Sequence, residues 1–381
     1  SKSIRVKYQS KPFKLNFFEF INIYKLEDVI INKNYNCIQK NNVVYKKNRI
    51  PIISESIKED FYFKALNKLK LKNLFNKNVD KTINTKKDIY YFEILNNKPN
   101  YYHFIVDNFL SLIFFLEKYK KDFIILFNDS IAKHINSYVY LVSKIYKKKI
   151  IVLNKNSNQV RVVNNLIFLN PIMYQKVRRV HGENINKISK SMIDEKYNIY
   201  NYPKKYKNSE GKTVYNQFIG NITPTTFFEN FDNFIKKITS AGVIKKKLKK
   251  NLYITRKKGG QFKNRSIFEE EKLIEFLKQR NFKVVSFEGL SVEKQIELMI
   301  NSNIVISVFG SNLTNTIFKR KGESVIELYP HQTFKNADFF KYIAEQRNLK
   351  YFRINCDLNK NEELLIKYKQ LNKILNSLRS I

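Results

Sequence analysis

Glycine and proline are scarce in this chain of 381 residues, which contains 9 and 7 of them. This scarcity excludes collagen-like chains and chains made mainly of flexible linkers. Cysteine is scarcer still, with Cys37 and Cys356 as the only two. Two cysteines cannot form the disulfide framework of a small secreted domain, and without a Cys-x-x-Cys pair nothing indicates a zinc site. We therefore expect the protein to stay in a reducing compartment.

Long hydrophobic runs are also missing. A membrane-spanning helix needs about 20 predominantly apolar residues, whereas the best run here, from Phe109 to Leu116, is followed at once by Glu117 and Lys118. The first 20 residues have no continuous apolar stretch of the kind found in signal peptides. The prediction is a cytoplasmic protein, and lysine-rich faces leave peripheral contact with the inner face of an anionic membrane open.

Several motifs that carry chemistry are absent. No Asp-x-Asp pair occurs, so a paired-carboxylate site for Mg²⁺ or Mn²⁺ on a diphosphate is not evident. The phosphate loop GxxxxGK[ST], the zinc motif HExxH and the nucleophile motif GxSxG are missing too. Charge on a leaving diphosphate would then have to be neutralised by arginine, lysine and a helix dipole. We predict neither a metal nor another cofactor.

What the chain has in excess is positive charge. Lys+Arg 71 against Asp+Glu 33 give a formal net charge of +38, while 43% hydrophobic residues suffice for a sizeable core. Three explanations stay open: a genome rich in A and T, which favours Lys, Asn, Ile, Phe and Tyr codons; an anionic membrane surface or acceptor; or nucleic acid. The basic residues are scattered and form no single arginine-rich arm, which favours the first explanation.

The order of apolar strands and amphipathic helices predicts an α/β protein. Strands are expected at 29–31, 43–45, 89–95, 123–127, 150–153, 160–169, 251–255, 283–287, 303–309, 324–329 and 350–354. Helices are expected at 57–71, 101–121, 131–147, 172–198, 226–240, 267–280, 291–302, 311–320, 335–347 and 360–379. Strict alternation in the last third indicates a parallel sheet covered on both faces. We predict two Rossmann-like domains facing a cleft, over residues 1–200 and 217–381, joined by a polar hinge over 201–216.

His103 and Asp107 lie four residues apart at the start of the helix expected at 101–121. This spacing places both side chains on one helical face. A carboxylate there can orient an imidazole or act as a base itself. The alternative is a surface histidine with a charged neighbour.

A basic loop follows the strand that ends at Thr255. Its candidate ligand-binding residues are Arg256, Lys257 and Arg265, which suit a pyrophosphate just past the carboxyl end of a strand. The alternative is a solvated loop in a lysine-rich chain.

Two further strand ends carry polar groups. One strand leads through Gly310 into a helix whose backbone N–H groups can bind an anion, although the segment is not GxGxxG. The candidate residues there are Gly310, Ser311, Asn312, Leu313, Thr314 and Asn315. In the next strand Glu327 could accept hydrogen bonds from ribose hydroxyls, or simply face solvent.

Taken in order, these motifs resemble glycosyltransferase family 61, over roughly residues 88–355. The family's early His-x3-Asp motif at the start of an apolar helix is similar to His103 and Asp107. Its middle motif is a strand ending in Arg, then a second Arg and an acidic helix start. Arg256, Arg265 and Glu269 are similar to it.

The family signature, His-Gly-Ala-Gly-Leu-Thr-Asn, is similar to residues 309–315 of this chain. Here Phe309 replaces the histidine and Asn312 a glycine, and Phe268 stands where the middle motif usually has an asparagine.

The resemblance implies an inverting GT-B-type enzyme that transfers a sugar from a nucleotide-sugar, of the UDP type, to a glycan acceptor in surface polysaccharide synthesis, such as capsule or lipopolysaccharide. The C-terminal domain would hold the donor and the N-terminal domain the acceptor, which could be lipid-linked. His103 would act as the base with Asp107 orienting it, although the two roles could be reversed. The alternatives are a nucleic-acid-binding protein, supported by charge alone, and a glycosyltransferase-like protein that binds without transferring.

Overall fold

The computed structural model describes only part of the chain, including most of its last third. The described residues are 2–9, 18–32, 37–40, 43–46, 79–92, 101–128, 133–153, 159–171, 179–181, 204–207, 213–216, 225–245, 247–256, 265–333 and 339–379. The helix expected at 57–71 lies outside these residues. Backbone contacts divide the chain into two compact units. Unit 1 is Ser1–Pro99 and His103–Phe231, and unit 2 is Asn100–Tyr102 and Asp232–Ile381.

The division between the units does not fall in the expected hinge. Residues 201–216 contain two short strands, β13 (Lys204–Lys207) and β14 (Thr213–Asn216), which pair with each other. The chain instead passes from unit 1 to unit 2 between Phe231 and Asp232, inside helix α6 (Thr225–Ser240). The boundary between the units therefore lies within a long amphipathic helix, whereas the polar composition of residues 201–216 had predicted a boundary earlier in the chain.

Unit 1 contains a mixed six-stranded sheet with strand order β1-β2-β11-β7-β8-β9. The neighbours β11, β7, β8 and β9 run parallel to one another. The pairs β1–β2 and β2–β11 are antiparallel. Its strands are β1 (Lys2–Gln9), β2 (Phe18–Leu26), β7 (Asp88–Phe92), β8 (Phe123–Asn128), β9 (Ile150–Leu153) and β11 (Leu166–Pro171).

Two further sheets belong to unit 1. A five-stranded sheet has the order β5-β4-β3-β10-β6, and a three-stranded sheet the order β12-β14-β13. Their remaining strands are β3 (Val29–Asn32), β4 (Cys37–Lys40), β5 (Val43–Lys46), β6 (Lys81–Ile83), β10 (Gln159–Val162) and β12 (Arg179–His181).

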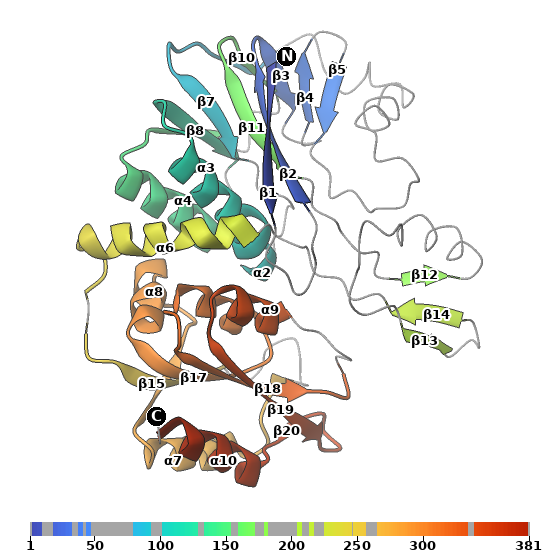
Figure 1. Ribbon diagram of the computed structural model, residues 1–381, viewed down its shortest axis with the longest axis vertical. Helices are drawn as coiled ribbons and strands as arrows, with labels where there is room; N and C mark the ends of the chain where they lie inside the picture. The colour runs from blue at the N-terminus through green and yellow to red at the C-terminus, as the bar shows by residue number, and fades with distance from the viewer. Residues whose placement is uncertain are drawn as a thin grey trace. The chain divides into compact units, whose positions relative to one another are not determined.

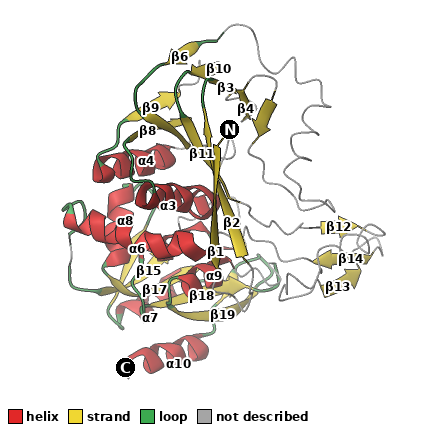
Figure 2. Cartoon of the chain, turned by 45° about the horizontal axis from the view of Figure 1, so that its top comes forward, coloured by secondary structure: helices red, strands yellow, loops and turns green. Residues whose placement is uncertain are grey.

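The faces of the six-stranded sheet are covered differently. Helices α3 (Leu110–Lys118) and α4 (Lys133–Tyr146) lie on one face (Figures 1 and 2), where Phe115 of α3 stacks on Tyr90 with 3.8 Å between ring centroids. On the other face Ile89 and Leu126 share a core with residues of the five-stranded sheet. Unit 1 therefore has a second sheet where a Rossmann-like domain would have helices, and the prediction for this half needs that correction.

The second sheet arises because the segment expected as one strand at 160–169 is two strands. β10 pairs with β3 and β6, and after a turn β11 pairs with β2 and β7 in the six-stranded sheet. The predicted helix at 172–198 is also wrong at Arg179–His181, which form β12.

Unit 2 is an open parallel sheet with strand order β16-β15-β17-β18-β19 and β20 antiparallel at its edge. The strands are β15 (Lys250–Thr255), β16 (Phe282–Ser286), β17 (Ser302–Val308), β18 (Ser324–Pro330), β19 (Lys350–Leu358) and β20 (Leu364–Leu365). The helices are α7 (Glu270–Lys278), α8 (Val292–Ile300), the 3₁₀ helix η4 (Ser311–Phe318), α9 (Phe339–Gln346) and α10 (Tyr368–Arg379). Numbered from β15, the parallel order is 2-1-3-4-5, one of the common doubly wound arrangements.

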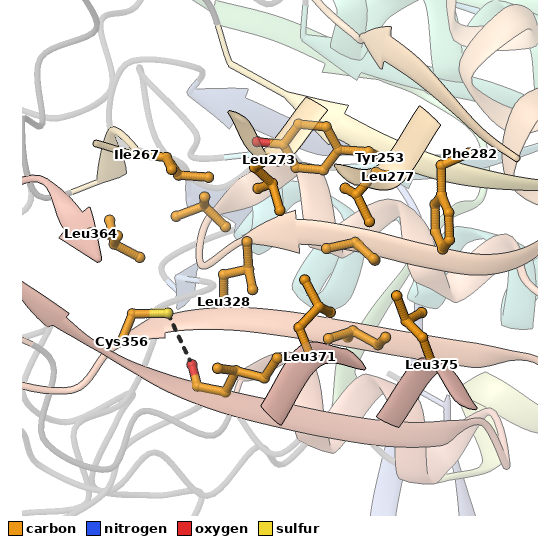
Figure 3. Close-up of a cluster of buried hydrophobic side chains, with 14 of the residues drawn as sticks. Tyr253, Ile267, Leu273, Leu277, Phe282, Leu328, Cys356, Leu364, Leu371 and Leu375 are labelled. Carbon is orange, nitrogen blue, oxygen red and sulfur yellow. Dashed lines mark hydrogen bonds between the residues drawn. The ribbon is translucent and has the colours of Figure 1, made fainter. Parts of the chain in front are cut away.

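Both faces of this sheet are covered, as the alternation in the sequence predicted. On one face the leucines of α7 and α10 share a core with Ile306, Leu328 and Ile354. Figure 3 shows part of this core, with Leu328 labelled. Helices α8 and α9 lie on the other face (Figure 1). Ser291 caps α8, since its side chain accepts a hydrogen bond from the Lys294 amide. The helix expected at 360–379 begins only at Tyr368, because Leu364 and Leu365 form β20 against β19.

A buried lysine, Lys319, binds the start of the central strand β17. The Lys319 ammonium is fully buried and donates to the Ser302 carbonyl at 2.9 Å and its hydroxyl at 2.8 Å, and it lies 3.4 Å from a Glu323 carboxylate oxygen. Burial, the largest cause, lowers the pKa of Lys319 to about 8, although the Glu323 carboxylate opposes that shift.

Replacing Lys319 with methionine should destabilise the protein by about 3 kcal/mol, because the buried carbonyl and hydroxyl of Ser302 lose their donor and Glu323 keeps only its ion pair with Lys249, at 3.0 Å. Between pH 8 and 10 the unfolded chain holds a proton at Lys319 that the folded chain has released, so the contribution of this lysine to stability rises with pH. Denaturant unfolding of both proteins at pH 7, 8, 9 and 10 measures this difference. A difference that shrinks as the pH rises contradicts the prediction.

Within the part of the chain that the structure describes, no helix combines the length and the apolar character that crossing a bilayer requires.

Candidate functional site

The site is built in unit 2, where the strand order reverses. The chain leaves β15 toward β16 on one side, and β17, β18 and β19 follow on the other. Arg256 directly follows β15, and Phe309 and Gly310 directly follow β17. In open α/β sheets, ligands bind outside the carboxyl ends of the two strands at such a reversal.

Arg256 and Gly310, which the sequence singled out separately, lie in contact. A Cβ atom built on Gly310 would lie 3.1 Å from Nη2 and 3.2 Å from both Cζ and Nη1 of Arg256. The guanidinium group therefore rests against the face of residue 310 that any other amino acid would occupy. Gly310 also has φ 155° and ψ 178°, a conformation that is almost restricted to glycine. The backbone conformation thus strongly favours glycine here, and the position of the Arg256 guanidinium favours it as well.

A second arginine, Arg265, lies close enough to Arg256 for the charge of Arg256 to lower its pKa. Burial, the larger cause, and the positive charge of Arg256 lower the pKa of Arg265 to about 10. Burial likewise lowers the pKa of Arg256, and Glu288 partly opposes that shift. Both arginines are half-buried. Two neighbouring, partly desolvated cations destabilise each other, and an anion bound by both would relieve that cost.

The end of β15 is held in place by the start of α7. Tyr253 and Thr255 both donate a hydrogen bond from their hydroxyl groups to Oε1 of Glu270, each at 2.5 Å. Ser307 of β17 donates to the Ile254 carbonyl at 3.0 Å. These bonds fix the strand end from which Arg256 projects. Glu269, the acidic residue of the middle motif, instead pairs with exposed Lys272 at 2.8 Å.

The segment after Gly310 forms the 3₁₀ helix η4 rather than the expected helix through 320. Its first residues, Ser311 and Asn312, are half-buried, while Leu313, Thr314 and Asn315 are buried. The Asn315 side-chain oxygen accepts a 2.6 Å hydrogen bond from the hydroxyl of Tyr101, which also belongs to unit 2. Tyr101 is a contact of the signature segment that sequence reasoning missed.

Phe309 is almost completely buried, and its ring packs against aromatic rings and a guanidinium group. The ring lies edge-on to Tyr329 and Phe340, with centroids 5.2 and 5.4 Å away. Cζ of Arg265 lies 5.4 Å from its centroid. The residue that replaces the family histidine therefore contacts one of the two arginines.

Glu327 is fully buried in the middle of β18. It accepts hydrogen bonds from the hydroxyl of Tyr351 and, at 2.8 Å, from Nε of Arg353, its cross-strand neighbour. The Arg353 guanidinium in turn lies 4.1 Å from the Tyr329 ring centroid. Arg353 and Tyr351 had no role in the sequence prediction. Their alternation places both on one face of β19, but only the register between β18 and β19 sets them beside Glu327.

Three predicted residues remain. His103 and Asp107 belong to unit 1, and Lys257 lies outside the described residues. His103 is half-buried at the end of the short helix α2 (Tyr101–His103), and its backbone carbonyl accepts a 3.2 Å hydrogen bond from the side-chain amide of Asn108. Asp107 lies in the π-helical segment η2 (Phe104–Phe109), a kind of segment that is frequent at functional sites. The side chain of Asp107 also lies outside what the structure describes.

A comparison with known families gives one match. The family model for glycosyltransferase 61 matches residues 101–326, which is more than half of the chain. The chain belongs to glycosyltransferase family 61.

Membership of family 61 implies glycosyltransferase activity, with a sugar donor and an acceptor as substrates. The match begins at Tyr101 and ends in β18, so it includes His103, both arginines and the signature segment. No curated protein matches the sequence. Among the residues that the structure describes, no group of three or more His, Cys, Asp or Glu is arranged to hold a metal ion.

Proposed function

We propose that this family 61 protein is an inverting GT-B-type glycosyltransferase that uses a nucleotide-sugar, a UDP-sugar by family resemblance, and needs no divalent metal. The observation that carries the proposal is the arginine pair at the strand reversal of unit 2. Arg256 rests against Gly310, and its positive charge helps to lower the pKa of Arg265. Two half-buried guanidinium groups side by side repel each other, and a diphosphate bound by both would relieve that repulsion.

A nucleoside diphosphate is the anion that fits this chemistry. In sugar transfer the bond from the anomeric carbon to the diphosphate breaks, and negative charge grows on the departing oxygen. Preorganised donors aimed at that charge stabilise the transition state. Arg256 and Arg265 would supply two such donors, and the first amides of η4 would add a positive dipole end. Glu327 remains our candidate for the nucleoside end, but as a fully buried residue it would act there by holding Arg353 and Tyr351 in place.

For the base we propose His103, with Asp107 orienting it. The imidazole would take the proton of the acceptor hydroxyl as the oxygen attacks the anomeric carbon opposite the diphosphate, which inverts the configuration. Their spacing of four residues and the π-helical segment that contains Asp107 support this assignment. Unit 2 would bind the donor and unit 1 the glycan acceptor, in the synthesis of a surface polysaccharide.

A thermal-shift screen against UDP-, GDP- and CMP-sugars, followed by an assay of sugar hydrolysis with any hit, tests the proposal. A donor at 100 times its Kd stabilises the folded protein by about 2.7 kcal/mol, which corresponds to a rise in Tm of several degrees. We expect this rise with UDP-sugars. No shift with any nucleotide-sugar, together with tight salt-dependent binding to nucleic acid, would favour the nucleic-acid alternative.

The same assay tests metal independence. We expect EDTA to leave the rate within about twofold, because two guanidinium groups already supply the positive charge that a divalent ion would otherwise bring. A large loss of activity that Mg²⁺ or Mn²⁺ restores would contradict this expectation and point to a metal site.

A further inference from the structure

Phe309 stands where the family signature has a histidine, and its surroundings indicate what it does instead. The side chain is 4% exposed, so it offers almost no surface to a substrate. The Arg265 guanidinium lies over its ring, with 5.4 Å from Cζ to the centroid. This distance falls within the range of an attractive cation–π contact.

We propose that Phe309 is a positioning residue that holds Arg265 in place for the donor diphosphate. Arg265 needs such support because the charge of Arg256 repels it. A carboxylate would also hold the guanidinium, but it would compete with the diphosphate for the same hydrogen-bond donors. The face of an aromatic ring attracts the cation and leaves its N–H groups available, and the attraction grows as water is removed.

The Phe309 ring is itself held in place by two other aromatic rings. Tyr329 of β18 and Phe340 of α9 pack edge-on against it, at 5.2 and 5.4 Å between centroids. The Tyr329 ring in turn contacts the guanidinium group of Arg353, whose Nε donates a hydrogen bond to buried Glu327. The ring under Arg265 is thus supported by two other elements of unit 2.

This inference rests on the proposed function, and a double-mutant cycle on UDP binding tests it. Calorimetry would compare the wild type with Phe309→Leu, Phe309→Tyr, Arg265→Ala and Phe309→Leu/Arg265→Ala. We expect Phe309→Leu to weaken UDP binding about five- to tenfold, as the loss of one cation–π contact implies. Phe309→Tyr keeps the ring and should bind nearly as the wild type does. In the Arg265→Ala background, Phe309→Leu should change Kd less than twofold, because the contact is already gone.

Phe276→Leu is the matched control, since the Arg280 guanidinium lies 3.7 Å from the Phe276 ring centroid at the far end of α7. It should lower Tm without changing the Kd for UDP. If Phe309→Leu does not fold, Phe309→Met keeps more of the buried volume and serves in its place.

Equal losses from Phe309→Leu with and without Arg265 would overturn the positioning role, even though UDP binds. A wild type that binds inorganic pyrophosphate with the expected coupling, but not UDP, would keep the role of Phe309 and reject a uridine donor. Binding of neither probe would overturn both proposals.

Discussion

Arg256→Ala is expected to abolish sugar transfer and donor binding while unit 2 stays folded. The lost guanidinium is one of two that would meet the charge on the departing diphosphate, and removing one such donor typically costs about 10²- to 10³-fold in rate. Stability should change little or even improve, because Arg256 is a half-buried cation that repels Arg265. Transfer rates and thermal melts of the same preparations measure both effects.

Two variants sharpen this test. Arg256→Lys keeps the charge but loses the planar group that rests against Gly310, so it should recover only a small part of the rate. Arg280→Ala is the matched control, because Arg280 follows α7 and donates to the Phe276 carbonyl at 2.9 Å and to Asn372 at 3.1 Å. It should lower Tm and leave transfer intact. An Arg256→Ala protein that transfers sugar at the parent rate would remove this arginine from the site.

The last third of the chain was the most predictable from sequence, for a physical reason. Its strands are short, apolar and separated by amphipathic helices, so local pattern and final topology agree. Unit 1 was less predictable because its second sheet depends on pairings between distant segments. β10 pairs with β3 and β6, and nothing local in residues 159–162 reveals that partner choice.

The site shows the same limit. The sequence identified Arg256 and Gly310 because each follows a strand, and parallel strands end at one edge of the sheet. It could not show that the guanidinium rests on the glycine, since that depends on how one strand end is held by Glu270. It also raised solvent exposure as the alternative for Glu327, whereas the structure buries this residue with Arg353. The sequence therefore predicts which polar residues lie at strand ends, but it does not predict which side chains pair between neighbouring strands.

Gly310→Ala should impair the enzyme nearly as much as the loss of Arg256, although it adds only a methyl group. That methyl carbon would lie 3.1 Å from Nη2 and 3.2 Å from Cζ of Arg256, which is tighter than most real contacts of a Cβ atom. The φ of 155° adds backbone strain of about 1–3 kcal/mol for any residue but glycine. The guanidinium or the strand end must then shift by a few tenths of an ångström, which moves the arginine out of line with the diphosphate. We expect about a 10²-fold loss of transfer and a lower Tm.

Gly322→Ala separates these two effects, because Gly322 has φ 84° and no atom within 4 Å of the added Cβ. It should lower Tm through strain alone and keep both donor binding and transfer. In an Arg256→Ala background, Gly310→Ala should then cause no further loss of donor binding, since the group it displaces is gone. Should Gly310→Ala instead keep full activity, or should it weaken binding equally with and without Arg256, the contact between this glycine and the arginine is not what shapes the site. The diphosphate would then have to be held by other groups.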